Sequence, residues 1–131
     1  MKERGKFMEY EKLYKYECPI DFSLNLIAGK WKVLIIWELG VGTKRFTQLE
    51  KLLPGITRKV LIEQLKELEL YQIIQREVYP QVPPKVEYSL TSQGKELFPV
   101  FDSLYKWGQT QIDLLNAQVD EQLEQCEVSN S

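Results

Sequence analysis

Apolar residues recur every three or four positions along most of this chain, and that spacing predicts a largely helical protein. One stretch departs from it. Residues 73–79 and 85–90 are short runs rich in β-branched and aromatic residues, which predicts two strands around a turn at 80–84. Prolines crowd this turn, and proline is excluded from central strands, so the turn is a stiff hairpin tip. Because an isolated hairpin is not stable in water, we expect it to pack against the helices.

Two helices are predicted directly before the hairpin, at 45–53 and 58–70, with Pro54-Gly55 as the turn between them. Thr57 is expected to cap the second helix. The apolar stripe of the first helix is predicted to be Phe46, Leu49, Leu52 and Leu53, and that of the second Leu61, Leu65 and Leu68. At about 100° per residue, the opposite side of the second helix carries Lys59, Ile62, Glu63 and Lys66. A helix-turn-helix followed by a hairpin predicts a winged helix.

Further helices are predicted on both sides of this unit. Before it, we expect a short helix from Asp21, its N-cap, to Ile27, and another over 30–39. The inward positions of the latter are predicted to be Trp31, Leu34, Ile35 and Leu39. After the hairpin, a helix should begin at Thr91 or Ser92, with a kink or break at Pro99. Gly108 is a further candidate break before a helix over 109–124.

Both ends of the chain carry apolar helix faces. In residues 2–16 this face consists of Phe7, Tyr10 and Tyr14. It could pack on a partner subunit or on its own domain, and the residues do not separate these alternatives. Near the other end the apolar positions are Ile112, Leu115, Val119 and Leu123.

Composition and charge fit one soluble globular domain. The chain has 131 residues, of which 44% are hydrophobic and 27% charged, and its net charge is −2. The charge is uneven, because residues 44–85 hold eight bases and five acids, whereas residues 109–131 hold five acids and no base. A basic middle can therefore face DNA although the whole chain is acidic.

The residues exclude most catalytic chemistry. Histidine is absent, which removes the commonest general base and a principal zinc ligand. No glycine-rich phosphate loop is present. We therefore expect neither an enzyme nor a metal or other cofactor. The chain has no signal peptide and no apolar run of membrane-spanning length, so a cytoplasmic location without membrane contact is expected.

The cations of the middle segment suit double-stranded DNA. Affinity for DNA comes chiefly from neutralised phosphates, and sequence is read by contacts to base edges. The residues suited to phosphates are Lys44, Arg45, Lys59 and Lys66. Arg58, in the first turn of its helix, could pair with guanine. Glu63 repels phosphate and either accepts from cytosine or faces solvent. For any one of these residues, a solvated helix face is the alternative.

Five segments carry a family resemblance, in this order along the chain: "CP", "GKWKVLIIWEL", "KRFTQLEKLLPGITRKVLIEQLKELE", "REVYPQVPPKVEYSLTSQGKEL" and "LYKWG". Together they resemble the HxlR-type family of winged helix-turn-helix transcriptional regulators, which are relatives of the MarR type. The resemblance implies an α+β fold, mostly α, with extra N- and C-terminal dimerisation helices. It implies an extension at 1–17, a DNA-binding domain at 18–108 and a C-terminal dimerisation helix at 109–131. The implied function is that of a transcriptional regulator, which binds a near-palindromic operator as a homodimer.

Residue by residue, the resemblance carries two sets of DNA contacts onto this sequence. On the second helix they are Thr57, Arg58, Lys59, Ile62 and Glu63, and on the wing Gln81, Val82 and Lys85. The terminal helices, with the faces at residues 7–14 and 112–123, would form the dimer. Ile62 and Glu63 differ from the uncharged polar residues more usual in the family, so the operator sequence cannot be borrowed, and the inducer is likewise unknown.

Cys18 matches the cysteine at which the family domain begins, and in some members that thiol senses oxidants or electrophiles. A small packed cysteine is the alternative. A weaker hypothesis pairs Cys18 with Cys126 of the other subunit on oxidation. A second departure lies at Gln72, where the family has glycine, so either Gln72 adopts a left-handed conformation or the turn differs. The competing function is a protein-interaction domain that uses the same dimeric scaffold without DNA.

Overall fold

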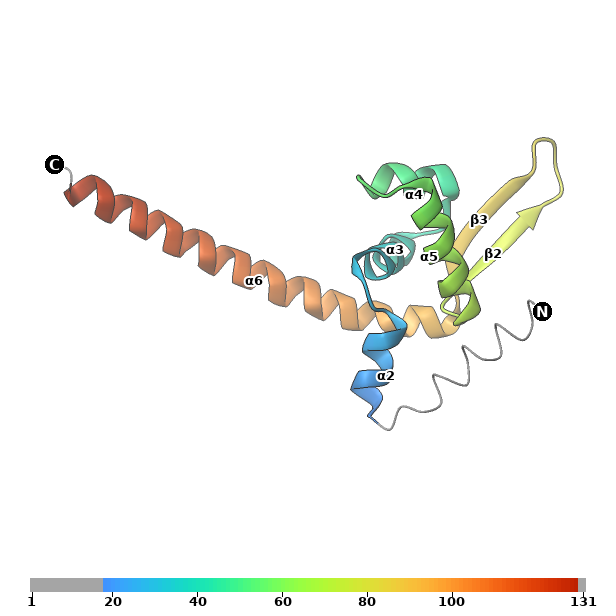
Figure 1. The fold of residues 1–131 in the computed structure, drawn as a ribbon, viewed down its shortest axis with the longest axis horizontal. Helices are drawn as coiled ribbons and strands as arrows, with labels where there is room; N and C mark the ends of the chain where they lie inside the picture. Colours follow the sequence, from blue (N-terminus) through green and yellow to red (C-terminus); the bar gives the residue numbers. More distant parts are fainter. Residues whose placement is uncertain (1–17, 130–131) are drawn as a thin grey trace. The chain divides into compact units, whose positions relative to one another are not determined.

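The computed structural model describes the backbone of residues 18–129. Its elements are α2 (Pro19–Leu26), α3 (Lys30–Val41), β1 (Lys44–Arg45), α4 (Phe46–Leu52), α5 (Arg58–Leu70), β2 (Ile74–Tyr79), β3 (Lys85–Leu90) and α6 (Ser92–Ser129), as Figure 1 shows. The chain divides into two compact units, one ending at Phe98 and one beginning at Pro99. The order of helices, hairpin and helix confirms the predicted mostly helical α+β fold.

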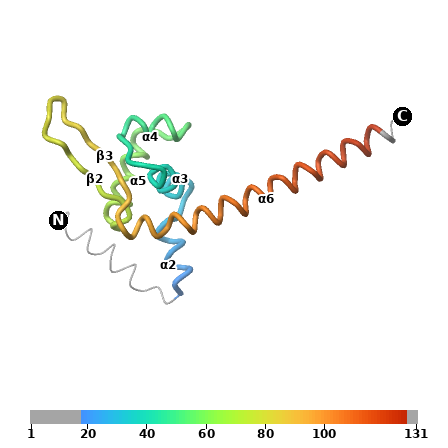
Figure 2. The backbone as a smooth tube through the Cα atoms, turned by 180° about the vertical axis from the view of Figure 1, so that it is seen from behind, coloured from blue at the N-terminus to red at the C-terminus, as the bar shows by residue number. Residues whose placement is uncertain are grey.

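The three strands form an antiparallel sheet in the order β1-β3-β2. Tyr79 lies opposite Lys85 and Ile74 opposite Leu90, so the hairpin register is regular along its whole length. The β2–β3 hairpin projects beyond the helices of its unit, with the 80–84 turn at its tip (Figures 1 and 2). The predicted strands and turn are confirmed, except that β2 begins one residue later than expected. Strand β1 was not foreseen, since two residues give no periodic signal.

The core of the first unit lies between α3, α5 and the sheet. Its buried side chains include Ile35, Ile36 and Leu39 of α3, Leu61, Leu65 and Leu68 of α5, and Ile74, Tyr88 and Leu90 of the strands. One ion pair crosses this core: the ammonium of Lys32, a buried residue on α3, contacts the half-exposed carboxylate of Glu67 on α5. Apolar burial and this pair together fix the rotation of α5 about its axis.

Helix α5 has the predicted bounds and the predicted cap. Thr57 Oγ1 accepts a hydrogen bond from the Val60 backbone N–H at 3.2 Å, which satisfies one of the donors that a helix start leaves free. Its exit turn contains Gln72 with φ of 61°, so a non-glycine residue takes the left-handed conformation there. Of the two alternatives for this turn, the first is correct.

The helices before α5 differ from the predictions in detail. Asp21 does not cap α2, which begins at Pro19 after Cys18, because proline suits the first helical position. Helix α4 begins at Phe46 and not at Arg45, whose backbone N–H instead donates to Gln48 Oε1 at 2.8 Å. Leu34 and Leu52 were expected to face the core, but both are exposed. Ile36 is buried instead of Leu34, because α3 packs on more than one side and its apolar positions do not form one stripe.

Helix α6 is continuous from Ser92 to Ser129. Thr91 caps the start of this helix, since Thr91 Oγ1 accepts a hydrogen bond from the Gly94 backbone N–H at 3.1 Å. The helix does not break at Pro99 or at Gly108, so the break expected at Gly108 and the alternative of a break at Pro99 are wrong. A proline removes one backbone hydrogen bond of a helix, and the hydrogen bonds of the neighbouring turns continue the helix past Pro99. Within the described part of the chain, no helix is both long enough and apolar enough to span a membrane.

Gly94 provides a test of how closely the first turn of α6 packs on the backbone of Ile73. A Cβ placed on Gly94 would lie 2.1 Å from the Ile73 carbonyl oxygen, which is held by hydrogen bonds from the Thr91 N–H and hydroxyl at 3.0 Å. We expect Gly94→Ala to lower the free energy of unfolding by about 1–3 kcal/mol, as overpacking does. Gly108→Ala is the matched control, because its Cβ would meet no atom within 4 Å. The control should be neutral or stabilising in urea unfolding. Equal effects of the two substitutions would contradict this packing.

Candidate nucleic-acid interface

The outward face of α5 is exposed while its other face is buried. Leu61, Leu65 and Leu68 are nearly inaccessible, and Lys59, Ile62, Glu63 and Lys66 face solvent. The predicted orientation of this helix is therefore confirmed. Ile62 retains 39% of its surface exposed. A helix that keeps cations and one accessible aliphatic side chain on its free face can lie in a major groove without losing its own core.

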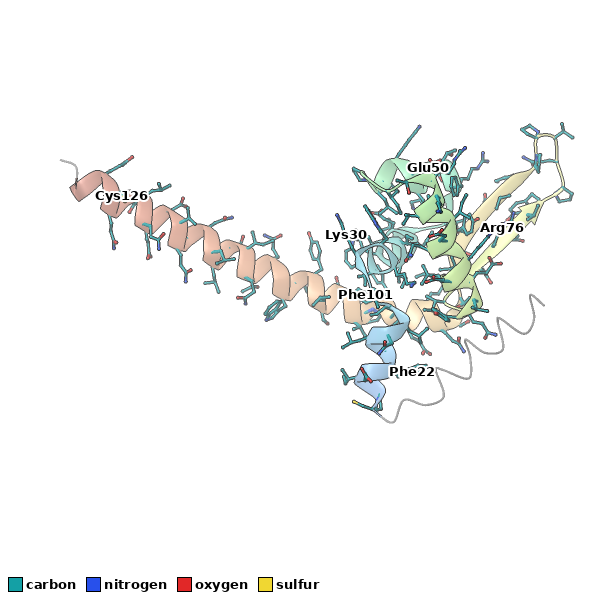
Figure 3. The ribbon with its side chains drawn as sticks, viewed as in Figure 1. Phe22, Lys30, Glu50, Arg76, Phe101 and Cys126 are labelled. Carbon is teal, nitrogen blue, oxygen red and sulfur yellow. The ribbon has the colours of Figure 1, made fainter. Side chains whose placement is uncertain are left out.

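Arg58 is held between α4 and α5. Its guanidinium lies 3.4 Å from Glu50 Oε1 and 5.4 Å from the centre of the Phe46 ring. The Arg58 side chain is still 68% exposed, so both contacts are at the surface and contribute little to stability. A base edge or a phosphate would have to replace the Glu50 carboxylate. Figure 3 shows Glu50 on α4.

The two cations of β1 differ in their surroundings. Lys44 is half-buried, and its ammonium donates to the Gly42 carbonyl oxygen at 3.1 Å. Arg45 is exposed and lies opposite Glu87 in the sheet. Lys44 is thus engaged by the backbone of its own loop, whereas Arg45 is accessible at the sheet edge.

The wing carries its own charge cluster. The Lys85 ammonium lies 2.8 Å from Glu87 Oε1 and 5.0 Å from the centre of the Tyr79 ring. The hydrogen bond from Lys85 is the largest cause that lowers the pKa of Glu87, and a hydrogen bond with Glu77 is the largest cause that raises the pKa of Tyr79. Because the pKa of Glu87 is lowered, the Lys85–Glu87 ion pair is fully present at pH values above the ordinary carboxyl pKa. The pair is lost as the pH falls through the lowered pKa of Glu87. Lys85 is therefore already paired with Glu87 at neutral pH.

The wing tip is the most accessible part of the hairpin. Gln81 is exposed, and the side chain of Val82 is fully exposed. The Gln81 backbone N–H donates to the Tyr79 carbonyl oxygen at 2.9 Å, which tightens the turn. The tip thus presents one polar and one apolar side chain on a stiff loop.

A groove of about 630 Å³ runs between α5 and the hairpin. It is lined by Phe46, Arg58, Ile62, Leu65, Lys66, Glu69, Arg76, Val86 and Tyr88. Arg76 on β2 (Figure 3) was not among the predicted site residues. The signal was available, because strand alternation puts Arg76 on the same face as the buried Ile74, and that face packs on the helices.

Both cysteine thiols are exposed, and no disulfide joins them within the described chain. Cys18 directly precedes α2, and Cys126 lies near the C-terminal end of α6 (Figure 3). Between residues 18 and 129 no cluster of three or more cysteine, aspartate and glutamate side chains could hold a metal ion. The predicted dimer residues Phe7, Tyr10 and Tyr14 lie outside the described residues.

Comparison with known proteins decides the family. The model of the HxlR-like helix-turn-helix family matches residues 26–116. The chain belongs to this family. Among curated relatives, it is 47% identical over 103 residues to the regulatory protein MalR of Fusobacterium mortiferum, covering 78% of this chain and 97% of MalR. It is 45% identical over 103 residues to the HTH-type transcriptional regulator YybR of Bacillus subtilis, covering 79% of this chain and 82% of YybR.

Solved structures give the same fold. The reduced form of the redox regulator HypR is 44% identical and matches with a TM-score of 0.72 over 76% of this chain and 99% of HypR. The reduced form of the transcriptional regulator YodB from B. subtilis is 40% identical, with a TM-score of 0.63 over 70% of this chain and 91% of YodB. As a member of the HxlR-like family, the chain is a DNA-binding transcriptional regulator of the winged helix-turn-helix type, and not an enzyme.

Proposed function

We propose that the protein binds a near-palindromic operator as a homodimer, with α5 of each subunit in a major groove and each wing tip in the adjacent minor groove. The observation that carries this proposal is the shared groove between the exposed face of α5 and the projecting hairpin. In a two-fold dimer, two such helices would contact half-sites about one helical turn apart. A regulator of transcription acts where the DNA is, so we assign it to the cytoplasm.

We assign the residues three roles. Arg58 reads a base edge, with Thr57, Ile62 and Glu63 beside it on α5. Phosphates are neutralised by Lys44, Arg45, Lys59 and Lys66, and the wing contributes Gln81, Val82 and Lys85. Two of these contacts lose part of their binding free energy, because an ion pair within the protein must break first: Arg58 must leave Glu50, and Lys85 must leave Glu87. A base edge then replaces the Glu50 carboxylate at Arg58, and DNA replaces the Glu87 carboxylate at Lys85.

We assign dimerisation to the terminal segments, 1–17 and 109–131, around a DNA-binding domain at 18–108. The supporting observation is an exposed apolar face on α6. Its members Ile112, Leu115, Val119 and Leu123 are between 52% and 59% exposed and recur at helical spacing. Apolar side chains at that spacing favour a partner helix.

Two variants on α5 separate phosphate binding from base reading. Wild-type affinity for duplex DNA should fall on the order of a thousandfold between 50 and 200 mM salt if six phosphates are contacted. Lys59→Ala should weaken binding equally on an operator selected from a random pool and on its scrambled version. Arg58→Ala should cost about 1–3 kcal/mol on the operator alone.

Fluorescence anisotropy with both duplexes measures these effects. Lys95→Ala is the control, because Lys95 is an exposed lysine that does not line the groove between α5 and the hairpin. An equal loss for Arg58→Ala on both duplexes would remove Arg58 from base reading. Binding that does not respond to salt would favour a protein-interaction domain over a DNA-binding one.

We further propose that oxidation regulates the dimer through Cys18 and Cys126 of the other subunit. Two observations support this: both thiols are exposed, and the relative HypR is described as a redox regulator. Diamide would take up two electrons and two protons as the two thiols form one disulfide.

The test is a non-reducing gel of diamide-treated protein. We expect a dimer band that dithiothreitol removes, and we expect Cys18→Ser and Cys126→Ser each to abolish it. A band that persists in Cys126→Ser would show that this pairing is wrong, and the absence of any band in the wild type would exclude the disulfide between subunits.

A further inference from the structure

The proposed docking places one DNA strand over a part of the protein that has no assigned role. On a duplex, a sugar–phosphate strand separates each major groove from the neighbouring minor groove. If α5 occupies the major groove and the wing tip the minor groove, that strand must cross the gap between α5 and the hairpin. This inference therefore rests on the proposed function.

The groove between α5 and the hairpin has the chemistry that a phosphodiester strand requires. Three cationic side chains line it, from both sides: Arg58 and Lys66 on α5 and Arg76 on β2. One carboxylate, Glu69, lines it as well, so cations remain in excess. The rest of the lining is apolar or aromatic, namely Phe46, Ile62, Leu65, Val86 and Tyr88. Such a floor suits the apolar face of a deoxyribose.

Arg76 is the cation best placed to bind this strand. It lies opposite Tyr88 in the hairpin and on the helix-facing side of the sheet. Its neighbour Glu77 is directed to the opposite face by strand alternation and so does not neutralise it. Among residues 18–129, Arg76 makes no ion pair or side-chain hydrogen bond, and its side chain is exposed.

The other two cations of the groove differ in availability. Lys66 is exposed and, within the described part of the chain, also lacks an ion-pair partner. Arg58 is already held by Glu50. Arg76 and Lys66 can therefore bind an anion without first breaking an intramolecular pair. An arginine fork fits two oxygens of one phosphate, and a lysine acts as a point charge beside it.

We propose that the groove between α5 and the hairpin is a binding site for a backbone phosphate of DNA, with Arg76 as its principal ligand and Lys66 as its second. Arg76 thereby joins the recognition helix to the wing as one continuous DNA-binding surface. The site recognises the phosphodiester and not the base, so its contribution is the same on every sequence.

The experiment compares Arg76→Ala with wild type on the selected operator and on its scrambled version, between 50 and 200 mM salt. One phosphate contact is lost in each subunit of the dimer, so the slope of log K against log salt should fall by about 1.8, which corresponds to about sixtyfold weaker binding at 0.1 M salt. The loss should be equal on the two duplexes. Arg76→Lys should retain the slope, because it keeps the charge, while losing part of the affinity.

Lys95→Ala is again the matched control, and equal thermal melting of all variants excludes unfolding as the cause. If wild type binds DNA and Arg76→Ala binds as tightly as Lys95→Ala, the phosphate site is wrong and the proposed function stands. A loss confined to the operator would also overturn it, because Arg76 would then read a base. If wild type binds neither duplex, the proposed function fails and the phosphate site fails with it.

Discussion

The burial of one leucine stripe on α5 is the constraint on which the rest of the site depends. Leu61, Leu65 and Leu68 can be removed from water only against α3 and the sheet, and burying each such side chain contributes about 1.5–3 kcal/mol. This burial fixes the rotation of the helix, and the Lys32–Glu67 ion pair fixes it further. The opposite face is then necessarily solvent-exposed. DNA recognition is proposed for the face that the core cannot use.

The charges on that surface are partly neutralised within the molecule. Glu50 holds Arg58 and Glu87 holds Lys85, while Arg76 and Lys66 have no such partner in the part of the chain that the structure describes. In the proposed complex, DNA must displace a carboxylate at Arg58 and at Lys85, whereas it adds a partner at Arg76 and Lys66.

The sequence predicted the elements with strong local signals. The bounds of α5, its Thr57 cap and the strand at 85–90 were correct because a periodic stripe, a capping side chain and a proline-rich turn each act over a few residues. Predictions failed where packing decides. Leu34 and Ile36 are equally apolar, and only the arrangement of neighbouring elements buries one of them. Strand alternation could have placed Arg76 on the helix-facing side of the hairpin, but only the docking of the hairpin on α5 brings it to the same groove as Lys66.

The most direct test of the account is chemical interference on a duplex selected by the protein from a random pool. Methylation of guanine N7 blocks the major groove, and methylation of adenine N3 blocks the minor groove. If α5 of each subunit lies in a major groove, N7 methylation should prevent binding at two positions about 10 base pairs apart, and N3 methylation should prevent it in the adjacent flanks. Interference only from N3 methylation, or none from either, would contradict placement of α5 in the major groove.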